Sequence, residues 1–587
     1  MRHGSHTREC MGNKTLKWLY KVPGKHRAWV VLLSILHVVL GAFGVLYALL
    51  LKAIVDHAVA GERTLFFRCC VFFLLLELGR ILLVSINRRC TELAKATLEN
   101  RFKAYLFEKI LYGDHARVTA THSGEWLNRL TNDVVVVSNG YVDILPGLLG
   151  MAVRMLSALI MILFIDKWIA IVMIPIGLVL SFLTYLIRKR LKKMHKAIQE
   201  TDGKLRIFMQ ESIESLMIIK SFGAEERTIS DGEAKMDEHK KARMRRNTYS
   251  VLANVGYLLT MNGMYILGIC YGGYGILVGT LSYGSLMAVS QLITQLQGPI
   301  VNITGLIPKV FTMSASAERL MEIEKYEVDG AGKSIGREND GGKSDRKTSA
   351  ARNRAKAAEL YSSMECLGMR DVDFTYYAPA TEDGEMSKEN MMQVLSGFSL
   401  EVRKGEFVAF SGPSGCGKST VLKLLMCLYQ PDQGELYLKS AGTERTLTAA
   451  ERPLFAYVPQ GNYLMSGTVR EIVSFSDPDA AGDTARIQKA LKISCASAFV
   501  DEKELGVDSV LGERGSGLSE GQMQRIAIAR AVFSERPVLL LDEATSGLDE
   551  ETEKQLLSNL RTMTDKTVII VTHRRAVMEA CDRVVEF

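Results

Sequence analysis

Residues 412–419 of this 587-residue chain have the types and spacing needed to hold a chain of phosphate groups. Their sequence, GPSGCGKS, fits the pattern G-x-x-x-x-G-K-[ST], in which backbone amides wrap the phosphates. Lys418 then reaches the β and γ phosphates, and the Ser419 hydroxyl coordinates Mg²⁺. The apolar run FVAFS before the loop and the periodic segment after it predict a strand, a loop and a helix. The predicted nucleotide contacts are Gly412, Ser414, Gly415, Cys416, Gly417, Lys418, Ser419 and Thr420.

Two carboxylates follow a second apolar run. The sequence PVLLLDEATSGLD places four aliphatic residues directly before Asp542 and Glu543, as in a buried parallel strand that ends at the ligand-binding edge of an α/β sheet. We predict that Asp542 holds the Mg²⁺ shell and that Glu543 orients and deprotonates the attacking water. A third run, TVIIVTH, brings His573 to the same kind of edge, where it contacts the γ-phosphate or orients the base.

The ten cysteines show neither a CxxC pair nor regular spacing, so neither a disulfide framework nor a zinc site is indicated. We expect a reducing, cytosolic environment for them. Cys416 allows two interpretations, because it lies inside the phosphate loop close to Lys418. It is either a reactive thiol activated by that cation or a small side chain that fills space, and we favour the second.

The stretch ERGSGLSEGQMQRIAIARAV, residues 513–532, begins as a polar turn rich in Gly and Ser and opens into a segment with helical apolar spacing, which comprises Ile526, Ile528, Ala529 and Val532. The free amides at the start of a helix form an anion site, so a phosphate is expected there. Glu520 stands in the middle of this turn, although a carboxylate repels a phosphate bound beside it.

Hydrophobic residues make up 48% of the chain and charged residues 23%, and the apolar runs lie before about residue 310. A membrane-spanning helix needs about 20 mostly apolar residues. Six segments qualify, at about 28–54, 65–86, 141–165, 168–187, 249–278 and 281–307. The long gaps between them are rich in Lys and Arg, so both termini are expected in the cytoplasm. This topology accounts for the net charge of +7, and we expect the lipid bilayer, and no nucleic acid, as a partner.

Charged residues inside the expected spans are costly and tend to mark function, and Glu77, Arg80 and Arg154 are considered in turn. Glu77 and Arg80 are three residues apart, so they can neutralise each other on one helix face. Arg154 has no such local partner. It either pairs across helices, for example with Glu77, or faces a water-filled cavity and helps to bind an anionic substrate, and we favour pairing.

Composition divides the chain into four parts. Residues 1–27 form a basic cytoplasmic segment, and no cleavage site follows them, so the first span is retained. Residues 28–327 form an all-α, six-span transmembrane domain with long cytoplasmic helical extensions. Residues 328–358 are polar and Gly-rich and are expected to form a flexible linker. Residues 359–587 are expected to form an α/β P-loop domain, which makes the chain a multidomain protein.

The sequence after residue 360 resembles the nucleotide-binding domain of ABC transporters, and the order of the whole chain resembles a half-transporter of the exporter type. The resemblance is carried by the phosphate loop and by YVPQGNYLMSGTVREI, GERG, LSEGQ, SGLD and TVIIVTH. It implies that Gln460 links Mg²⁺ and the catalytic site to the membrane helices. It also implies that Tyr376 stacks on adenine and that Asp549, in the D-loop SGLD, contacts the nucleotide. The loop 378–392 is longer than is usual in the family.

In this family the signature motif of one subunit closes over ATP held by the phosphate loop of the other. The resemblance therefore implies that Ser519, Gly521 and Gln522 contact the ATP of a second copy. Glu520 replaces the glycine that is usual at its position. We predict that its side chain points away from the nucleotide, so that Glu520→Gly would not greatly raise the maximal ATPase rate.

The resemblance implies an ATP-driven exporter that works by alternating access as a dimer and uses ATP and Mg²⁺. All the motifs occur in one chain, so a homodimer is favoured and a related partner subunit is the alternative. An ATP-driven importer on the same scaffold and an ATP-gated channel are the competing functions. The protein is expected to be a multi-pass protein of a bacterial plasma membrane, and its substrate is left open.

Overall fold

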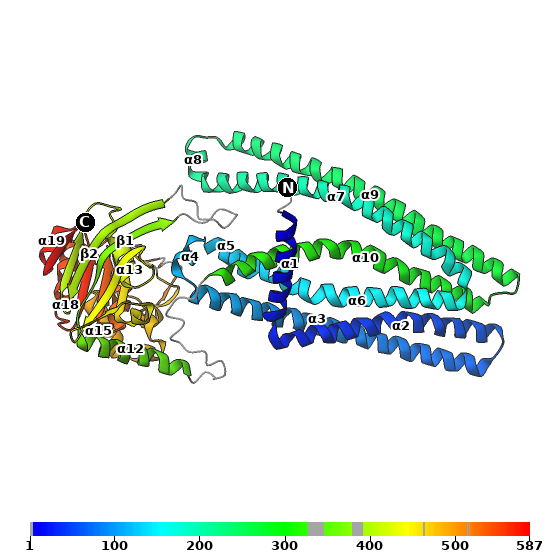
Figure 1. Cartoon of the computed structure of the whole chain (residues 1–587), viewed down its shortest axis with the longest axis horizontal. Coiled ribbons are helices and arrows are strands. Elements are labelled where there is room, and N and C mark those ends of the chain that lie inside the picture. The colour runs from blue at the N-terminus through cyan, green and yellow to red at the C-terminus, as the bar shows by residue number, and fades with distance from the viewer. Residues whose placement is uncertain are drawn as a thin grey trace. The chain divides into compact units, whose positions relative to one another are not determined.

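The computed structural model describes residues 4–121, 123–326, 345–377, 391–461, 464–512, 515 and 517–587. It divides the chain into two compact units, which are described separately (Figure 1). Unit 1 comprises Met1–Tyr105 and Thr131–Leu320, and unit 2 comprises Leu106–Leu130 and Met321–Phe587. Most of the long loop 378–392 and part of GERG lie outside the described residues.

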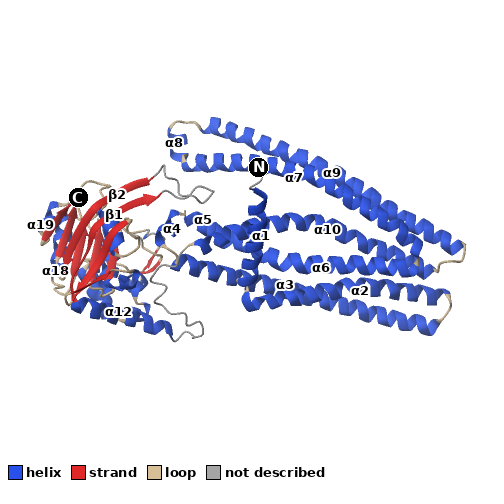
Figure 2. Cartoon of the chain, viewed as in Figure 1, coloured by secondary structure: helices blue, strands red, loops and turns tan. Residues whose placement is uncertain are grey.

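Unit 1 consists of helices only in its described part (Figure 2). Within it, α2 packs along α6, and α7 packs along α9. Small residues allow close approach: a Cβ on Gly41 of α2 would lie 3.0 Å from the carbonyl oxygen of Gly150 on α6. The helices are α1 (Gly4–Lys21), η1 (Gly24–Arg27), α2 (Ala28–Val59), α3 (Arg63–Tyr112), α6 (Val134–Ile165), α7 (Lys167–Glu214), α8 (Leu216–Ser221), α9 (Glu225–Leu277) and α10 (Tyr283–Met321).

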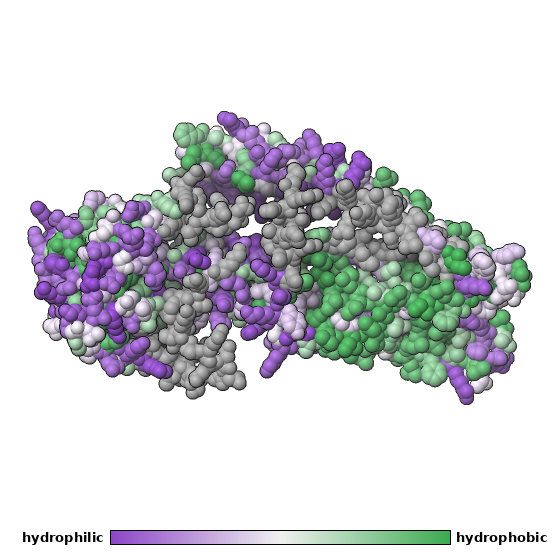
Figure 3. Space-filling model, in the orientation of Figure 1, coloured by the Kyte–Doolittle hydropathy of each residue, from purple (hydrophilic) through white to green (hydrophobic). Residues whose placement is uncertain are grey.

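Four helices in the described part of the chain are long and apolar enough to cross a membrane, at Gly24–Val59, Arg63–Tyr112, Ser123–Ile165 and Glu225–Leu277. They contain four of the six predicted spans. The predicted span 168–187 falls within α7, and the span 281–307 overlaps α10 from residue 283 onward; both stay predictions. Large apolar side chains such as Phe67, Leu82 and Phe164 are more than 60% exposed, and Figure 3 shows apolar surface in green over the α2 and α3 side of unit 1. Such an apolar surface is stable in lipid, not in water.

The charged residues of the spans follow the sequence expectation in part. Arg80 Nε donates to Glu77 Oε2 at 2.8 Å, so this pair neutralises itself on α3 as predicted. Arg154 is exposed on α6 and makes no ion pair with any residue that the structure describes. The favoured expectation that Arg154 pairs across helices, for example with Glu77, is therefore not met within the described chain, and Arg80 already holds the Glu77 carboxylate.

Unit 2 is built on two larger sheets. An antiparallel sheet has the order β2-β1-β4-β5, and a parallel sheet has the order β11-β3-β10-β9-β6. The central strands β9 and β10 are buried throughout, as their uninterrupted aliphatic sequences predict. The strands are β1 (Met364–Tyr377), β2 (Met391–Arg403), β3 (Phe407–Ser411), β4 (Gln433–Ser440), β5 (Thr443–Thr446), β6 (Phe455–Val458), β9 (Val538–Asp542), β10 (Thr567–Val571) and β11 (Arg583–Glu586), with a small pair β7 (Gly467–Thr468) and β8 (Val510–Leu511).

Helices cover the parallel sheet and complete unit 2. The longer ones are α12 (Asp345–Ser363), α13 (Lys418–Leu425), α15 (Thr484–Ile493), α17 (Glu520–Phe533) and α18 (Glu550–Arg561), and the short ones are α4 (His115–Ala120), α5 (Ser123–Asn128), α14 (Val469–Val473), α16 (Ser497–Asp501) and α19 (Arg575–Glu579). A helical unit followed by an α/β unit confirms the predicted fold class.

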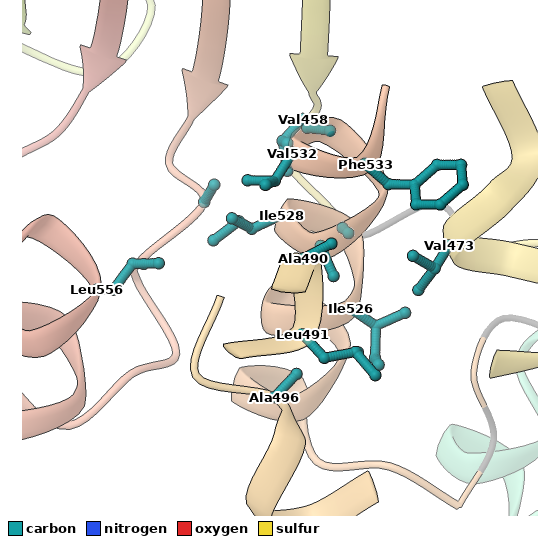
Figure 4. Close-up of a cluster of buried hydrophobic side chains, with 14 of the residues drawn as sticks. Val458, Val473, Ala490, Leu491, Ala496, Ile526, Ile528, Val532, Phe533 and Leu556 are labelled. Carbon is teal, nitrogen blue, oxygen red and sulfur yellow. The ribbon is translucent and has the colours of Figure 1, made fainter. Parts of the chain in front are cut away.

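The helix α17 is fixed by a buried core. Figure 4 shows Ile526, Ile528 and Val532 of this helix packed among Leu491 of α15 and Leu556 of α18. These side chains are at most 6% exposed, which confirms the helical spacing found in the sequence. The packing holds the start of α17, where Ser519 and Gly521 lie, in a defined position.

Residues 328–344 of the expected linker lie outside the described residues, and the described part, residues 345–358, is helical. Residues 345–358 belong to α12, and Ala357 and Tyr361 of this helix are buried in the core of unit 2. The Tyr361 hydroxyl lies 3.0 Å from Thr567 Oγ1 on β10, and Arg354 pairs with Asp477 at 2.7 Å. The alanines favour a helix, and the apolar residues at 357, 360 and 361 give it one face to bury.

Candidate functional site

The phosphate loop lies between β3 and α13, as predicted. Gly412, Gly415 and Gly417 have φ values of 150°, 86° and 104°, in the region that side chains disfavour. The Lys418 ammonium is buried and donates to the carbonyl oxygens of Gly412 and Pro413, both at 2.7 Å. The loop therefore curves around a cation at the start of a helix, which is the arrangement that binds a polyphosphate.

Cys416 packs inside this loop. Its Sγ lies 3.6 Å from Lys418 Nζ, and a Cβ on Gly412 would lie 3.2 Å from the same sulfur. The side chain is half-buried against the loop backbone. The contact with Lys418 is the one that a reactive thiol requires, and the packing against Gly412 is the one that a space-filling side chain requires, so the structure is compatible with both interpretations.

Ser419 and Asp542 meet as a pair of oxygen ligands. Ser419 Oγ donates to Asp542 Oδ1 at 2.9 Å, and the Tyr457 hydroxyl donates to Oδ2 at 3.0 Å. Burial raises the pKa of the Asp542 carboxyl, and the two hydroxyl donors partly offset this effect. A hydroxyl beside a carboxylate is the oxygen-only donor set that Mg²⁺ prefers, so these residues fit the expected ion.

Tyr457 was not identified from the sequence. It lies on β6, which pairs with β9, and this pairing brings its hydroxyl to Asp542. The sequence signal for Tyr457 was its position three residues before Gln460. The strand order was needed to show that its hydroxyl contacts Asp542.

Glu543, Gln460 and His573 come together at the end of the parallel sheet. Gln460 Nε2 donates to Glu543 Oε2 at 2.7 Å, and His573 Nε2 lies 3.6 Å from Glu543 Oε1. Glu543 has φ of 50°, a conformation that costs a non-glycine residue about 1–3 kcal/mol. Its amide donates to the Val571 carbonyl at 3.2 Å, which holds this strained residue beside β10. The carboxylate is therefore oriented on both sides, as a general base requires.

Tyr376 lies beside the phosphate loop, packed in an aromatic cluster. Its ring centroid is 4.9 Å from that of Phe374 and 5.5 Å from that of Tyr429. Its hydroxyl lies 3.1 Å from Thr420 Oγ1. The ring of His115 in α4 is 5.6 Å from Tyr429, so a segment that precedes the α/β domain in sequence joins this cluster.

Ser519 caps α17. Its Oγ accepts from the Gln522 amide at 3.3 Å, and its own amide donates to Gln522 Oε1 at 3.0 Å. Gly521 follows in the first turn, where a Cβ would lie 2.4 Å from the carbonyl oxygen of Gly547. Gly521 is therefore required by its own chain, whatever it contacts in a second copy.

Glu520 lies beside the turn that contains Gly547. Its Cγ is 3.2 Å from the position that a Cβ on Gly547 would occupy. Its side chain is exposed at the first position of α17, where a carboxylate interacts favourably with the helix dipole.

We expect Glu520→Gly to change the maximal ATPase rate by less than about threefold, because it removes only a surface contact and a weak dipole interaction. The rate is measured on the purified full-length protein at saturating ATP. A large increase would show that the carboxylate repels bound nucleotide and would contradict the predicted orientation.

Asp549 has a local role that the resemblance did not imply. Its carboxylate caps α18 and accepts from the Thr552 amide at 2.9 Å and from the Thr552 hydroxyl at 2.8 Å. These two bonds lower the pKa of Asp549. The structure does not place it in the cluster of Glu543, Gln460 and His573.

Two family models match the chain. One, described as the ABC transporter transmembrane region, matches residues 30–300, and the other, described as ABC transporter, matches residues 395–546. Among solved structures, a bacterial Atm1-family ABC exporter with ATP bound is similar, with a TM-score of 0.73, 21% identity, and coverage of 95% of this chain and 93% of that chain. At this identity the likeness shows the fold alone.

Curated relatives span nearly the same length. The uncharacterized ABC transporter ATP-binding protein YfiC of Bacillus subtilis is 25% identical over 97% of this chain and 89% of its own. The ATP-dependent lipid A-core flippase 1 of Colwellia psychrerythraea is 24% identical over 91% and 85%. The glutathione/L-cysteine transport system protein CydC of Escherichia coli is 29% identical over 80% and 76%.

Proposed function

The chain belongs to the ABC transporter family, and from that premise we propose that it is an exporter-type half-transporter and that two copies form an ATP-driven exporter. The observation that carries this proposal is the cluster beside the phosphate loop, in which Ser419 contacts Asp542 and Gln460 contacts Glu543. All these groups belong to a chain that also carries apolar helices long enough to cross a membrane.

The side chains divide the work of ATP hydrolysis. Lys418 and the loop amides hold the β and γ phosphates, and Ser419 and Asp542 hold Mg²⁺, which neutralises the charge of the phosphates when it is bound. Gln460 and His573 orient the Glu543 carboxylate, which takes a proton from the attacking water. In this proposal Tyr376 lies against adenine, because its ring adjoins the loop and its hydroxyl reaches Thr420.

The second copy supplies the rest of each site. We infer that Ser519, Gly521 and Gln522, at the exposed start of α17, close over the ATP of the other copy and contribute helix amides to its phosphates. Asp549, which also caps α18, is proposed to contact the nucleotide, as the resemblance implies. A homodimer is sufficient, because one chain contains both halves of the site.

The coupling to transport runs through the segments that follow the membrane helices. His115 contacts Tyr429, which contacts Tyr376, so a helix outside the α/β domain is in contact with the nucleotide site. ATP binding drives a switch between inward-facing and outward-facing states only through its different affinity for the two states. We place the protein in the plasma membrane of a bacterium, with both termini in the cytoplasm, because several of the relatives are bacterial proteins.

The test is the ATPase rate of the full-length protein in proteoliposomes, with lipids, drugs and peptides added in turn and Glu543→Gln as the inactive control. An exporter is expected to hydrolyse ATP faster with its substrate and to accumulate that substrate in inside-out vesicles. Depletion from such vesicles would instead show an importer. Ion conductance gated by ATP, without stimulation of hydrolysis, would show a channel.

A further inference from the structure

The turn formed by residues 546–548 is held on one side by a buried side chain of α17. Gln524 is 2% exposed, and its Nε2 donates to Ser546 Oγ at 2.9 Å. Its Oε1 accepts from the Gly547 amide, also at 2.9 Å. Both polar atoms of the Gln524 side chain therefore bond to this one turn. The carbonyl of Gly547 also packs against Gly521, which joins the turn to the start of α17.

Arg574 holds the same turn from the other side. Its Nη2 donates to the Ser546 carbonyl and its Nη1 to the Leu548 carbonyl, both at 2.8 Å. Nη1 also lies 3.1 Å from Glu553 Oε2 on α18. Only a planar guanidinium has enough donors at fixed angles to reach two carbonyls and a carboxylate together.

The acid partner of Arg574 is deeply buried. The Glu553 side chain is 1% exposed, and its other oxygen, Oε1, has no hydrogen-bond partner among the described residues. A buried carboxylate of this kind requires a cation, so Arg574 is held where it is. The arginine can therefore act as a fixed anchor for the turn.

The turn lies between two catalytic elements. It begins just after Glu543, whose carbonyl accepts from the Ser546 amide at 3.3 Å, and Arg574 directly follows His573. At the other end it contacts Gly521, beside Ser519. A displacement of this turn would therefore shift the base and the start of α17 together.

We propose that Arg574, anchored by Glu553, is a positioning residue that sets the 546–548 turn and, through it, Glu543 and the start of α17. This inference rests on the proposed ATPase function. Arg574 does not contact the phosphate loop elements that grip ATP, so its loss should lower kcat and leave ATP binding unchanged. A misplacement of about 1 Å at a reacting group costs up to about 100-fold in rate.

The experiment uses the full-length protein in proteoliposomes. Arg574→Ala alone leaves the Glu553 carboxylate buried without its cation and can impair folding, so the double variant Arg574→Ala/Glu553→Gln is the decisive one. We expect it to unfold at the temperature of the wild type, to bind ATP within twofold of the wild-type Kd, and to lose about tenfold in kcat. Arg574→Lys should recover part of that loss. Arg575→Ala, which changes the neighbouring exposed arginine, is the matched control.

A role limited to balancing the charge of Glu553 predicts the opposite result. In that case the double variant would again be as stable as the wild type, but its kcat would lie within twofold of that of the control. This result would overturn the proposal. Hydrogen exchange gives a readout without ATPase: the amides of residues 546–548 should exchange about tenfold faster in the double variant. Unchanged exchange would also reject the proposal. Failure of the proposed function would appear separately, as a wild-type rate no higher than that of Glu543→Gln.

Discussion

Glu543→Gln is expected to lower the kcat of ATP hydrolysis by at least about 100-fold and to leave ATP bound with its normal affinity. The glutamine has the same shape as the glutamate and can still bond to Gln460, so the site keeps its geometry. It cannot accept a proton from water, and His573 at 3.6 Å orients the carboxylate but does not replace it. The measurements are phosphate release by the full-length protein and the Kd for ATP.

The matched control for this variant is Glu504→Gln, which changes an exposed glutamate elsewhere in unit 2. It should hydrolyse ATP at the wild-type rate. If Glu543→Gln retains more than about a tenth of the wild-type rate, the water is activated by another group, and the assignment of the base is wrong. If it also loses ATP binding, Glu543 has a structural role that its strained backbone would then explain.

The sequence predicted the phosphate loop and the strand-borne acids correctly in outline, because each is encoded within about ten residues. The glycines of the loop have the positive φ values that the motif requires, and β9 ends at Asp542 as its aliphatic run predicts. The capped start of α17 was also predictable, since Ser519 and Gln522 form a capping box visible in the sequence.

Contacts between distant strands were not predictable in this way. Tyr457 reaches Asp542 across 85 positions of sequence, and Gln460 reaches Glu543 across 83, because β6 pairs with β9. The motif resemblance named Gln460 but not its partner. For Asp549 the family pattern gave a contact with the nucleotide but not the local bond, in which its carboxylate caps α18. In α12 the burial of one face stabilises a helix that composition alone does not predict.

A second large effect is expected in mixed dimers of two inactive chains. Lys418→Ala removes the cation of the phosphate loop. Ser519→Asp keeps a side chain that can cap α17 but adds a negative charge at its exposed start, where it would repel the γ-phosphate held by the other copy. Each variant alone should lose at least about 100-fold in kcat, because both sites of its dimer carry the defect. A dimer that contains one chain of each kind, isolated through two different affinity tags, should regain about half of the wild-type rate.

The reason is the head-to-tail arrangement of the proposed dimer. If each ATP lies between Lys418 of one copy and Ser519 of the other, the mixed dimer collects both defects in one site and leaves the second intact. Pairing a wild-type chain with a chain that carries both substitutions must then give an inactive dimer, because each site receives one defect. If Lys418 and Ser519 instead served the same ATP within one chain, the two results would be exchanged. Comparing these two dimers therefore decides between shared and separate sites. Activity in the dimer of a wild-type chain and a doubly substituted chain would refute the shared site.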